Sequence, residues 1–190
     1  TAFGQSTFVV QGQQVLPSGD VVVVEGDVNM SVKGKGFIAI FSKQVGSLVS
    51  LQYAGREMIA TPPVPLFWRA TTDNDKGTAM SFTAGAWYAA SLARKCTNWE
   101  IRQDQGSATV IFDYKFSISA EVTVRIAYTV LANGTIHVKT HYKGAVGLPN
   151  LPILAVSFKM SADYNQSEWY AMGPEENYID RNFGARLGVF

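Results

Sequence analysis

The chain has 190 residues, of which 47% are hydrophobic, 12% aromatic and 16% charged, and its formal net charge at pH 7 is +1. This length and composition suit one large folded domain or two small ones and exclude a disordered chain. The near-zero charge excludes a general electrostatic attraction to nucleic acid or an anionic membrane surface, and the short apolar runs exclude a bilayer-spanning segment.

The single cysteine, Cys96, excludes a disulfide within the chain and a cysteine metal cluster. Its apolar and basic neighbours in "LARKCTNWE" favour a buried, inert thiol over a catalytic one. The N-terminus shows no signal-peptide features, so we expect a reducing cytoplasm as the compartment. The sequence does not begin with Met, which suggests a part of a longer polypeptide.

Strand patterns dominate the first half of the chain. A strand-like segment at Ser6 to Val10 precedes a loop cluster at residues 16–20, which we interpret as a weak boundary. Apolar and polar residues then alternate through residues 27–33 and, after a Gly-rich turn, through residues 37–41. We predict a strand at each of these two positions.

One helix is predicted, at residues 84–96, because "AGAWYAASLARKC" is rich in Ala and ends with two basic residues that suit a helix C-terminus. Alternation resumes after it, with Val110, Phe112, Tyr114 and Phe116 on one face. The next run, Ile118 to Val130, predicts a long strand that is bent or bulged.

Asn133 and Gly134 form the preferred pair for a tight hairpin turn, because both positions tolerate positive φ. A return strand is expected at residues 135–142 and a further strand at residues 154–160. The whole pattern predicts an antiparallel all-β chain.

His137 and His141 are four residues apart, the spacing of a zinc pair on a helix. On a strand, however, four residues span about 13 Å. Zinc–nitrogen bonds are only about 2 Å long, so one ion cannot reach both rings. We therefore predict two histidines on a solvent-facing side of a strand.

The cluster Asp73, Asn74 and Asp75, followed by Gly77, has the composition of a calcium loop without its spacing. The calcium-loop pattern needs acidic ligands at alternating positions and a later Glu. We predict instead an Asx-type turn whose short side chains satisfy backbone donors. Such a turn can also belong to a functional loop.

Glu175 and Glu176, with Asp180, offer paired carboxylates. Glycosidases need two carboxyl groups about 5 to 10 Å apart across a sugar cleft, and nothing in the sequence places these groups in one. A turn rim that satisfies Arg181 or Arg186 is the favoured interpretation. Four tryptophans could stack on sugar rings, but a mostly β core also needs large aromatics; they are Trp68, Trp87, Trp99 and Trp169.

Two longer motifs are more specific than these single residues. They are "FWRATTDNDKG", Phe67 to Gly77, and "GPEENYIDRNFGARLG", Gly173 to Gly188. In order and spacing they resemble two signatures of the C-terminal domain of the large β-galactosidases of glycoside hydrolase family 2. Some members of that family carry this domain as a separate small chain. The segment "FSKQVGSLVSLQYAGREMI" also resembles the family's approach to the first signature, and "AFGQ" resembles the last strand of a preceding immunoglobulin-like domain.

The resemblance implies a domain organisation and a fold. Residues 1–16 would be the last strand or linker of the preceding immunoglobulin-like domain, and residues 17–190 would be the C-terminal domain, incomplete at its C-terminus. The implied fold is an antiparallel β-supersandwich like that of galactose mutarotase, truncated, with one short helix.

The resemblance also implies a function. The family carries its catalytic glutamates on a (β/α)8 barrel that is absent here, so the chain alone should be inactive and contains no catalytic residue. It would be a non-catalytic domain that shapes the active site of a β-galactosidase acting on terminal β-D-galactosides such as lactose. The implied partner is the catalytic barrel, in the same chain or in a separate large subunit. The parent enzyme would need Mg and a monovalent cation, with no metal or cofactor in this chain.

The first motif implies a mobile loop over the galactose site, here residues 77–83, with Phe67 and Trp68 as its anchor. The loop and its support are assigned to Arg69, Asp73, Asn74, Asp75 and Gly77, where Gly77 is the expected hinge. The second motif is assigned a structural role, and its candidate residues are Glu176, Asn177, Tyr178, Asp180 and Arg181.

Two other functions stay open. One is a stand-alone carbohydrate-binding β-sandwich module. The other is an aldose mutarotase, which would need a general acid and base converging on one sugar, with His137 and His141 as the natural candidates.

Overall fold

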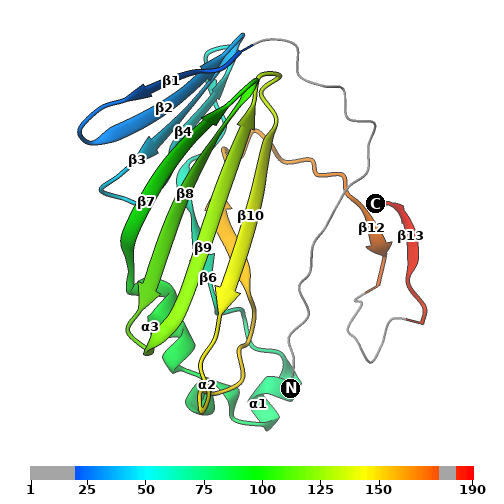
Figure 1. The fold of residues 1–190 in the computed structure, drawn as a ribbon. Coiled ribbons are helices and arrows are strands. Elements are labelled where there is room, and N and C mark those ends of the chain that lie inside the picture. The colour runs from blue at the N-terminus through cyan, green and yellow to red at the C-terminus, as the bar shows by residue number, and fades with distance from the viewer. Residues whose placement is uncertain (1–19, 176–182) are drawn as a thin grey trace. The chain divides into compact units, whose positions relative to one another are not determined.

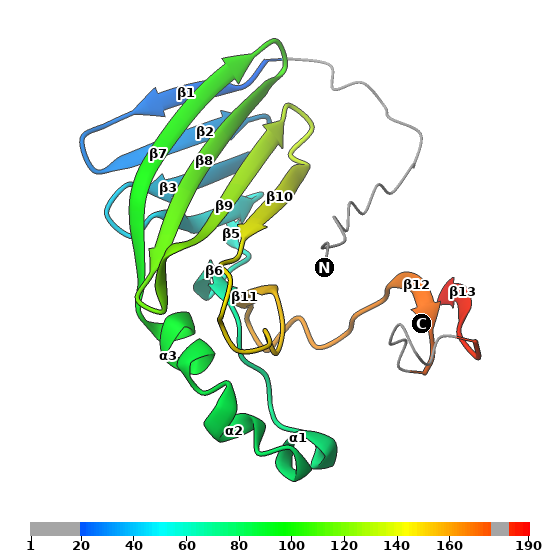
Figure 2. The ribbon, with the colours of Figure 1, turned by 60° about the horizontal axis from the view of Figure 1, so that its bottom comes forward.

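The computed structural model of the chain describes residues 20–175 and 183–190. The chain divides into two compact units, Thr1–Lys159 and Met160–Phe190. The larger unit is a sandwich of antiparallel sheets with three short helices at one end (Figures 1 and 2). The expected antiparallel all-β sandwich is therefore confirmed, although it carries three short helices where one was expected.

One sheet has five strands that follow one another in space as they do in sequence. They are β1 (Val22–Glu25), β2 (Asn29–Gly34), β3 (Phe37–Ser42), β4 (Ser47–Tyr53) and β5 (Arg56–Glu57). The strands expected at residues 27–33 and 37–41 are β2 and β3, and their alternation separates an inner from an outer face. Met30, Val32, Ala39 and Phe41 on the inner face are completely buried.

The second sheet has four strands in the order β10-β9-β8-β7. They are β7 (Arg94–Asp104), β8 (Ser107–Phe116), β9 (Ser119–Leu131) and β10 (Ile136–Lys143). The long strand expected from Ile118 is β9, and the expected irregularity is a register shift where β9 pairs with Lys115 and Phe116 of β8. The inward residues of β8 and β9 are buried, as their alternation predicts.

The hairpin expected at Asn133 and Gly134 joins β9 to β10. Of this pair, Gly134 has the positive φ, of 87°. Asn133 instead uses its side chain, whose Oδ1 accepts a hydrogen bond from the amide of Thr135 at 2.9 Å. One left-handed residue is enough because the amide of Leu131 still bonds the carbonyl of Thr135, so the turn consists of the three residues 132–134.

The two sheets face each other across an aromatic core. Phe41 of β3 lies 6.3 Å from Phe112 and 5.5 Å from Tyr128 between ring centroids. A further pair of strands, β6 (Thr61–Leu66) and β11 (Ala155–Lys159), forms a two-stranded antiparallel sheet that carries the chain out of the core toward the helices. Here β11 is the strand expected at residues 154–160.

The helices are α1 (Asp73–Gly77), α2 (Met80–Thr83) and α3 (Ala86–Leu92). The helix expected at residues 84–96 is α3, but it ends at Leu92 because β7 begins at Arg94. Arg94, Lys95 and Cys96 pair with Phe116, Lys115 and Tyr114 of β8. Backbone pairing along a long hairpin outweighs the weak helical preference of this segment.

The smaller unit contains a two-stranded antiparallel sheet of β12 (Tyr170–Gly173) and β13 (Arg186–Val189). Trp169 and Phe190 extend it by exchanging two backbone hydrogen bonds of 3.0 Å. Within residues 20–175 and 183–190, no helix is long and apolar enough to cross a membrane.

Candidate functional site

The first motif begins with an aromatic anchor at the end of β6. Phe67 is completely buried, and its ring lies 4.8 Å from that of Phe116 and 5.3 Å from that of Trp87. Its amide donates to Ser91 Oγ at 3.0 Å, which joins the motif to α3. Trp68 packs against the edge of the core, half-buried. The expected anchor is thus confirmed, with Phe67 as its deeper member.

The acidic cluster that follows forms helix α1 and not the expected turn. Thr72 is its N-cap: Thr72 Oγ1 accepts from the amide of Asp75 at 3.3 Å, while the Asp75 carboxylate accepts from the amide of Thr72 at 2.8 Å. This reciprocal capping box satisfies two backbone donors that a helix start leaves free. The signal was present in the sequence, because Thr72 precedes an acidic residue by three positions.

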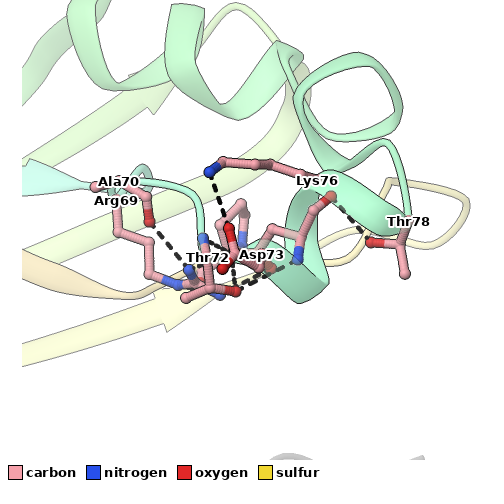
Figure 3. Close-up of polar contacts among 8 residues, drawn as sticks. Arg69, Ala70, Thr72, Asp73, Lys76 and Thr78 are labelled. Atoms are coloured by element: carbon pink, nitrogen blue, oxygen red, sulfur yellow. Dashed lines mark hydrogen bonds and ion pairs between the residues drawn. The ribbon is translucent and has the colours of Figure 1, made fainter.

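Arg69, labelled in Figure 3, pairs with Asp75 at the centre of the site. The guanidinium meets the carboxylate in two parallel bonds, Nη1 to Oδ2 at 2.5 Å and Nη2 to Oδ1 at 3.1 Å. Arg69 also donates from Nε to the carbonyl of Pro152 at 3.3 Å. The hydrogen bond from Arg69, and then that from the Thr72 amide, lower the pKa of Asp75 to about 2. We call this pair the Arg69–Asp75 brace.

The remaining polar residues of the motif point to solvent. The side chain of Asp73 is 98% exposed and pairs with Lys76 at 2.9 Å, one turn further along α1 (Figure 3). Asn74 is exposed as well. The cluster therefore divides by position: Asp75 bonds Arg69 and Thr72 within the motif, whereas Asp73, paired with Lys76, and Asn74 are exposed to solvent.

The segment expected as a mobile loop, residues 77–83, is mostly helical. Gly77 is the last residue of α1, and the left-handed conformation belongs to Ala79, whose φ is 54°. Helix α2 then places Met80 partly inward and leaves Phe82 90% exposed. The mobility of this segment and the hinge role of Gly77 stay predictions.

A pocket of about 800 Å³ lies between the helices and the connection from β10 to β11. One wall comes from the first motif and α2, with Arg69, Asp75, Thr78, Met80, Thr83 and Ala84, and the other from residues 147–152. Two side-chain donors hold the second wall in place. Trp87 Nε1 donates to the carbonyl of Pro149 at 3.0 Å, and Arg69 Nε donates to the carbonyl of Pro152. Sequence reasoning missed this wall, because "GLPNLP" carries no chemistry of its own.

The other candidate residues lie apart from this pocket. His137 and His141 are exposed on β10, as predicted, and neither lines it. Cys96 is half-buried and not fully buried as expected, and burial raises the pKa of its thiol. Glu175 is exposed. The second-motif candidates Glu176, Asn177, Tyr178, Asp180 and Arg181 lie outside the described residues.

Over residues 20–175 and 183–190, no three His, Cys, Asp or Glu side chains gather closely enough to hold a metal ion.

The sequence of the chain is similar to a known protein family and to several of its members. The sequence model of the family described as "Beta galactosidase small chain" matches residues 33–190. The chain is 54% identical, over its whole length, to a β-galactosidase of Halalkalibacterium halodurans, and 44% identical over 88% of its length to one of Clostridium acetobutylicum. It covers 19% of each of these two proteins.

A shorter relative has a different organisation. A β-galactosidase small subunit of Latilactobacillus sakei is 31% identical over 90% of this chain, which covers 59% of that subunit. The matched region thus occurs both inside long β-galactosidase chains and in a separate small subunit. With the family's sequence model matching most of its length, the chain belongs to the β-galactosidase small chain family.

Proposed function

We propose that the chain is a non-catalytic domain of a β-galactosidase of glycoside hydrolase family 2, and that it shapes the wall of an active site that acts on terminal β-D-galactosides such as lactose. The family membership and the names of the long relatives support this proposal. So does the length of the chain, which is about one fifth of those relatives.

The observation that carries the proposal is the Arg69–Asp75 brace. Hydrolysis of a glycoside needs two carboxyl groups across a cleft, one of them able to give a proton near neutral pH. Asp75 is the one carboxylate among the residues that line the pocket, and its pKa of about 2 keeps it ionised at neutral pH. The site is therefore built to hold a shape and not to transfer protons.

The partner follows from the same reasoning. The catalytic carboxylates, and any Mg or monovalent cation that the parent enzyme needs, would belong to a barrel domain in the same chain or in a separate large subunit. Asp73 and Asn74, exposed on α1, are the polar groups that this domain offers to that partner or to the galactoside.

The experiment is a complementation assay. A parent β-galactosidase that lacks the region of residues 33–190 should be inactive on a galactoside, and this chain added separately should restore activity. The isolated chain should hydrolyse nothing. Full activity of the deleted parent would overturn the proposal.

The two rival functions have direct readouts. A binding module would bind galactose or lactose in calorimetry as an isolated chain. However, the residues that line the pocket include no aromatic ring on which a sugar could stack. A mutarotase would accelerate the interconversion of galactose anomers in polarimetry, but His137 and His141 do not converge on the pocket.

A further inference from the structure

Asn133 lies in the turn of residues 132–134 between β9 and β10, and a glycine follows it in the sequence. Every other asparagine of the chain precedes a residue that carries a side chain. A Cβ on the following residue obstructs contact between an asparagine side chain and the next backbone nitrogen, whereas glycine leaves that nitrogen accessible. The geometry of the turn then determines whether the two groups react.

The side chain of Asn133 is folded back toward the backbone that follows it. Its Oδ1 accepts a hydrogen bond from the amide of Thr135 at 2.9 Å. A backbone donor at this oxygen stabilises the negative charge that develops there when the adjacent carbon Cγ is attacked. Asn133 is exposed, and its Nδ2 makes no hydrogen bond to any residue that the structure describes. This nitrogen is therefore free to leave into solvent.

Two hydrogen bonds restrain the attacking group, which is the backbone nitrogen of Gly134. Its N–H donates to the carbonyl of Leu131 at 2.9 Å, and the carbonyl of Gly134 accepts from the hydroxyl of Tyr53 at 2.5 Å. Gly134 is also buried beside the rings of Tyr53 and Phe37. The nitrogen can reach the side chain of Asn133 only when this turn opens. Tyr53, at the end of β4 in the other sheet, therefore slows the reaction.

We propose that Asn133 is a site of spontaneous deamidation, and that the hydrogen bond from Tyr53 to Gly134 sets its rate. The nitrogen of Gly134 loses its proton and bonds to Cγ of Asn133, and the bond from Cγ to Nδ2 breaks. Nδ2 leaves as ammonia with that proton, and a five-membered imide ring remains. Water then opens the ring at either carbonyl, which yields aspartate or an isoaspartyl link.

The two products affect the fold differently. Aspartate keeps the backbone as it is and keeps an oxygen that can accept from Thr135. The isoaspartyl link routes the backbone through the side chain of residue 133 and lengthens the turn by one carbon. Because the turn fixes the register of a hairpin, the isoaspartyl form should disturb the pairing of β9 with β10. This inference does not depend on the proposed function.

The test is the ageing of the folded full-length parent protein at mildly alkaline pH, followed by peptide mass spectrometry. Asn133 should gain about 1 Da, the difference between an amide and an acid. Asn150, which is exposed and precedes Leu151, is the internal control and should convert at least about tenfold more slowly. Equal rates at the two sites, or no conversion at Asn133, would overturn the proposal.

A second measurement tests the role of Tyr53. Tyr53→Phe keeps the ring near Phe37 but removes the bond to Gly134, so deamidation should become about fivefold faster, the effect of one hydrogen bond on the opening of the turn. Tyr88→Phe, at a 52% exposed position on α3, is the matched control and should leave the rate unchanged. An unchanged rate in Tyr53→Phe would contradict the assigned restraint.

Wild-type protein unfolded in urea gives the rate without any restraint, and Asn133 should convert faster there than in the folded protein. Equal rates in the two states would also contradict the restraint, whether or not Tyr53→Phe folds. Amide hydrogen exchange in β10 then separates the two products. It should be unchanged in Asn133→Asp and faster in protein aged to the isoaspartyl form. Equal exchange in both would show that the lengthened turn leaves the hairpin intact, against this inference.

Discussion

Asp75 is the residue on which the architecture of the site depends. It caps α1, pairs with Arg69, and through Arg69 reaches the carbonyl of Pro152 on the opposite wall. A carboxylate with so many donors is held in its ionised form. The acidic character of this motif therefore serves positioning, and the exposed Asp73 differs from Asp75 in role although both lie in one turn.

The first prediction concerns the pH dependence of stability in Asp75→Asn. The pKa of Asp75 is about 2 in the folded chain, against about 3.9 in an unfolded chain. A lowered pKa stabilises the fold above the unfolded value, and this stabilisation is lost as the pH falls through the folded value. In urea unfolding, the wild-type chain should be more stable than the variant at pH 7, and the difference should shrink below about pH 4.

The control for that series is Asp73→Asn, whose side chain is 98% exposed. It should change the urea midpoint little at any pH, because exposed ion pairs contribute little to stability. If the difference in the free energy of unfolding between wild type and Asp75→Asn stayed constant down to pH 2, the carboxylate charge would not be what stabilises the Arg69–Asp75 brace.

The second prediction concerns Trp87, the donor that holds the other wall. Trp87→Phe removes the hydrogen bond to Pro149 and part of a buried ring, so it should cost more than about 1 kcal/mol of stability. Amide hydrogen exchange should become faster in residues 147–152. Trp99→Phe, at a partly exposed position under Lys43, is the matched control and should leave that exchange unchanged.

At the scale of elements, several strands were predicted, whereas β1, β4, β6, β7 and the helical end were not. Alternation placed β2, β3, β8, β9 and β10 correctly, because a sandwich with one buried face per sheet imposes period two on its strands. Helices α1 and α2 have five and four residues, too short to show a helical period. The local sequence signal for α1 is the capping residue Thr72, and the end of α3 is set by strand pairing far along the chain.

The third prediction tests the hairpin between β9 and β10. Gly134 has a φ of 87°, and a Cβ there would lie 3.0 Å from the ring of Tyr53 and 3.2 Å from that of Phe37. Gly36 has a similar φ of 81° but open space around it. Gly36→Ala should cost about 1 kcal/mol from backbone strain alone, and Gly134→Ala should cost about 1 kcal/mol more from crowding. Equal costs in urea unfolding would mean that the two rings move aside freely.

At the scale of the whole molecule, the pocket illustrates what sequence reasoning could not reach. Its walls come from residues 69–84 and 147–152, which carry no common motif. They meet because β6 and β11 pair and lead both segments to the same end of the sandwich. The first motif marked one wall through its residues, while the second wall is defined by topology alone. A single sequence gives no access to such long-range pairing.

The two sheets are also joined by polar contacts inside the core, and these give the last prediction. Tyr114 of β8 donates its hydroxyl to the carbonyl of Gly46, in the turn between β3 and β4. Its neighbour Tyr128 is 1% exposed, and burial raises the pKa of its hydroxyl to about 12. That hydroxyl makes no hydrogen bond within the described residues. The nearby hydroxyl of Ser47 partly offsets this rise in the pKa of Tyr128, but it donates its own proton to the carbonyl of Pro63.

The two tyrosines should therefore respond to the same substitution in opposite ways. Tyr114→Phe removes a hydrogen bond between the sheets and leaves the Gly46 carbonyl without its donor, so the free energy of unfolding should fall by about 1 kcal/mol. Tyr128→Phe removes a buried hydroxyl that has no such bond, so stability should be unchanged or rise by up to about 1 kcal/mol. Urea unfolding at pH 7 measures both. A loss in Tyr128→Phe equal to that in Tyr114→Phe would show that this hydroxyl is hydrogen-bonded, to Ser47 or to a water molecule.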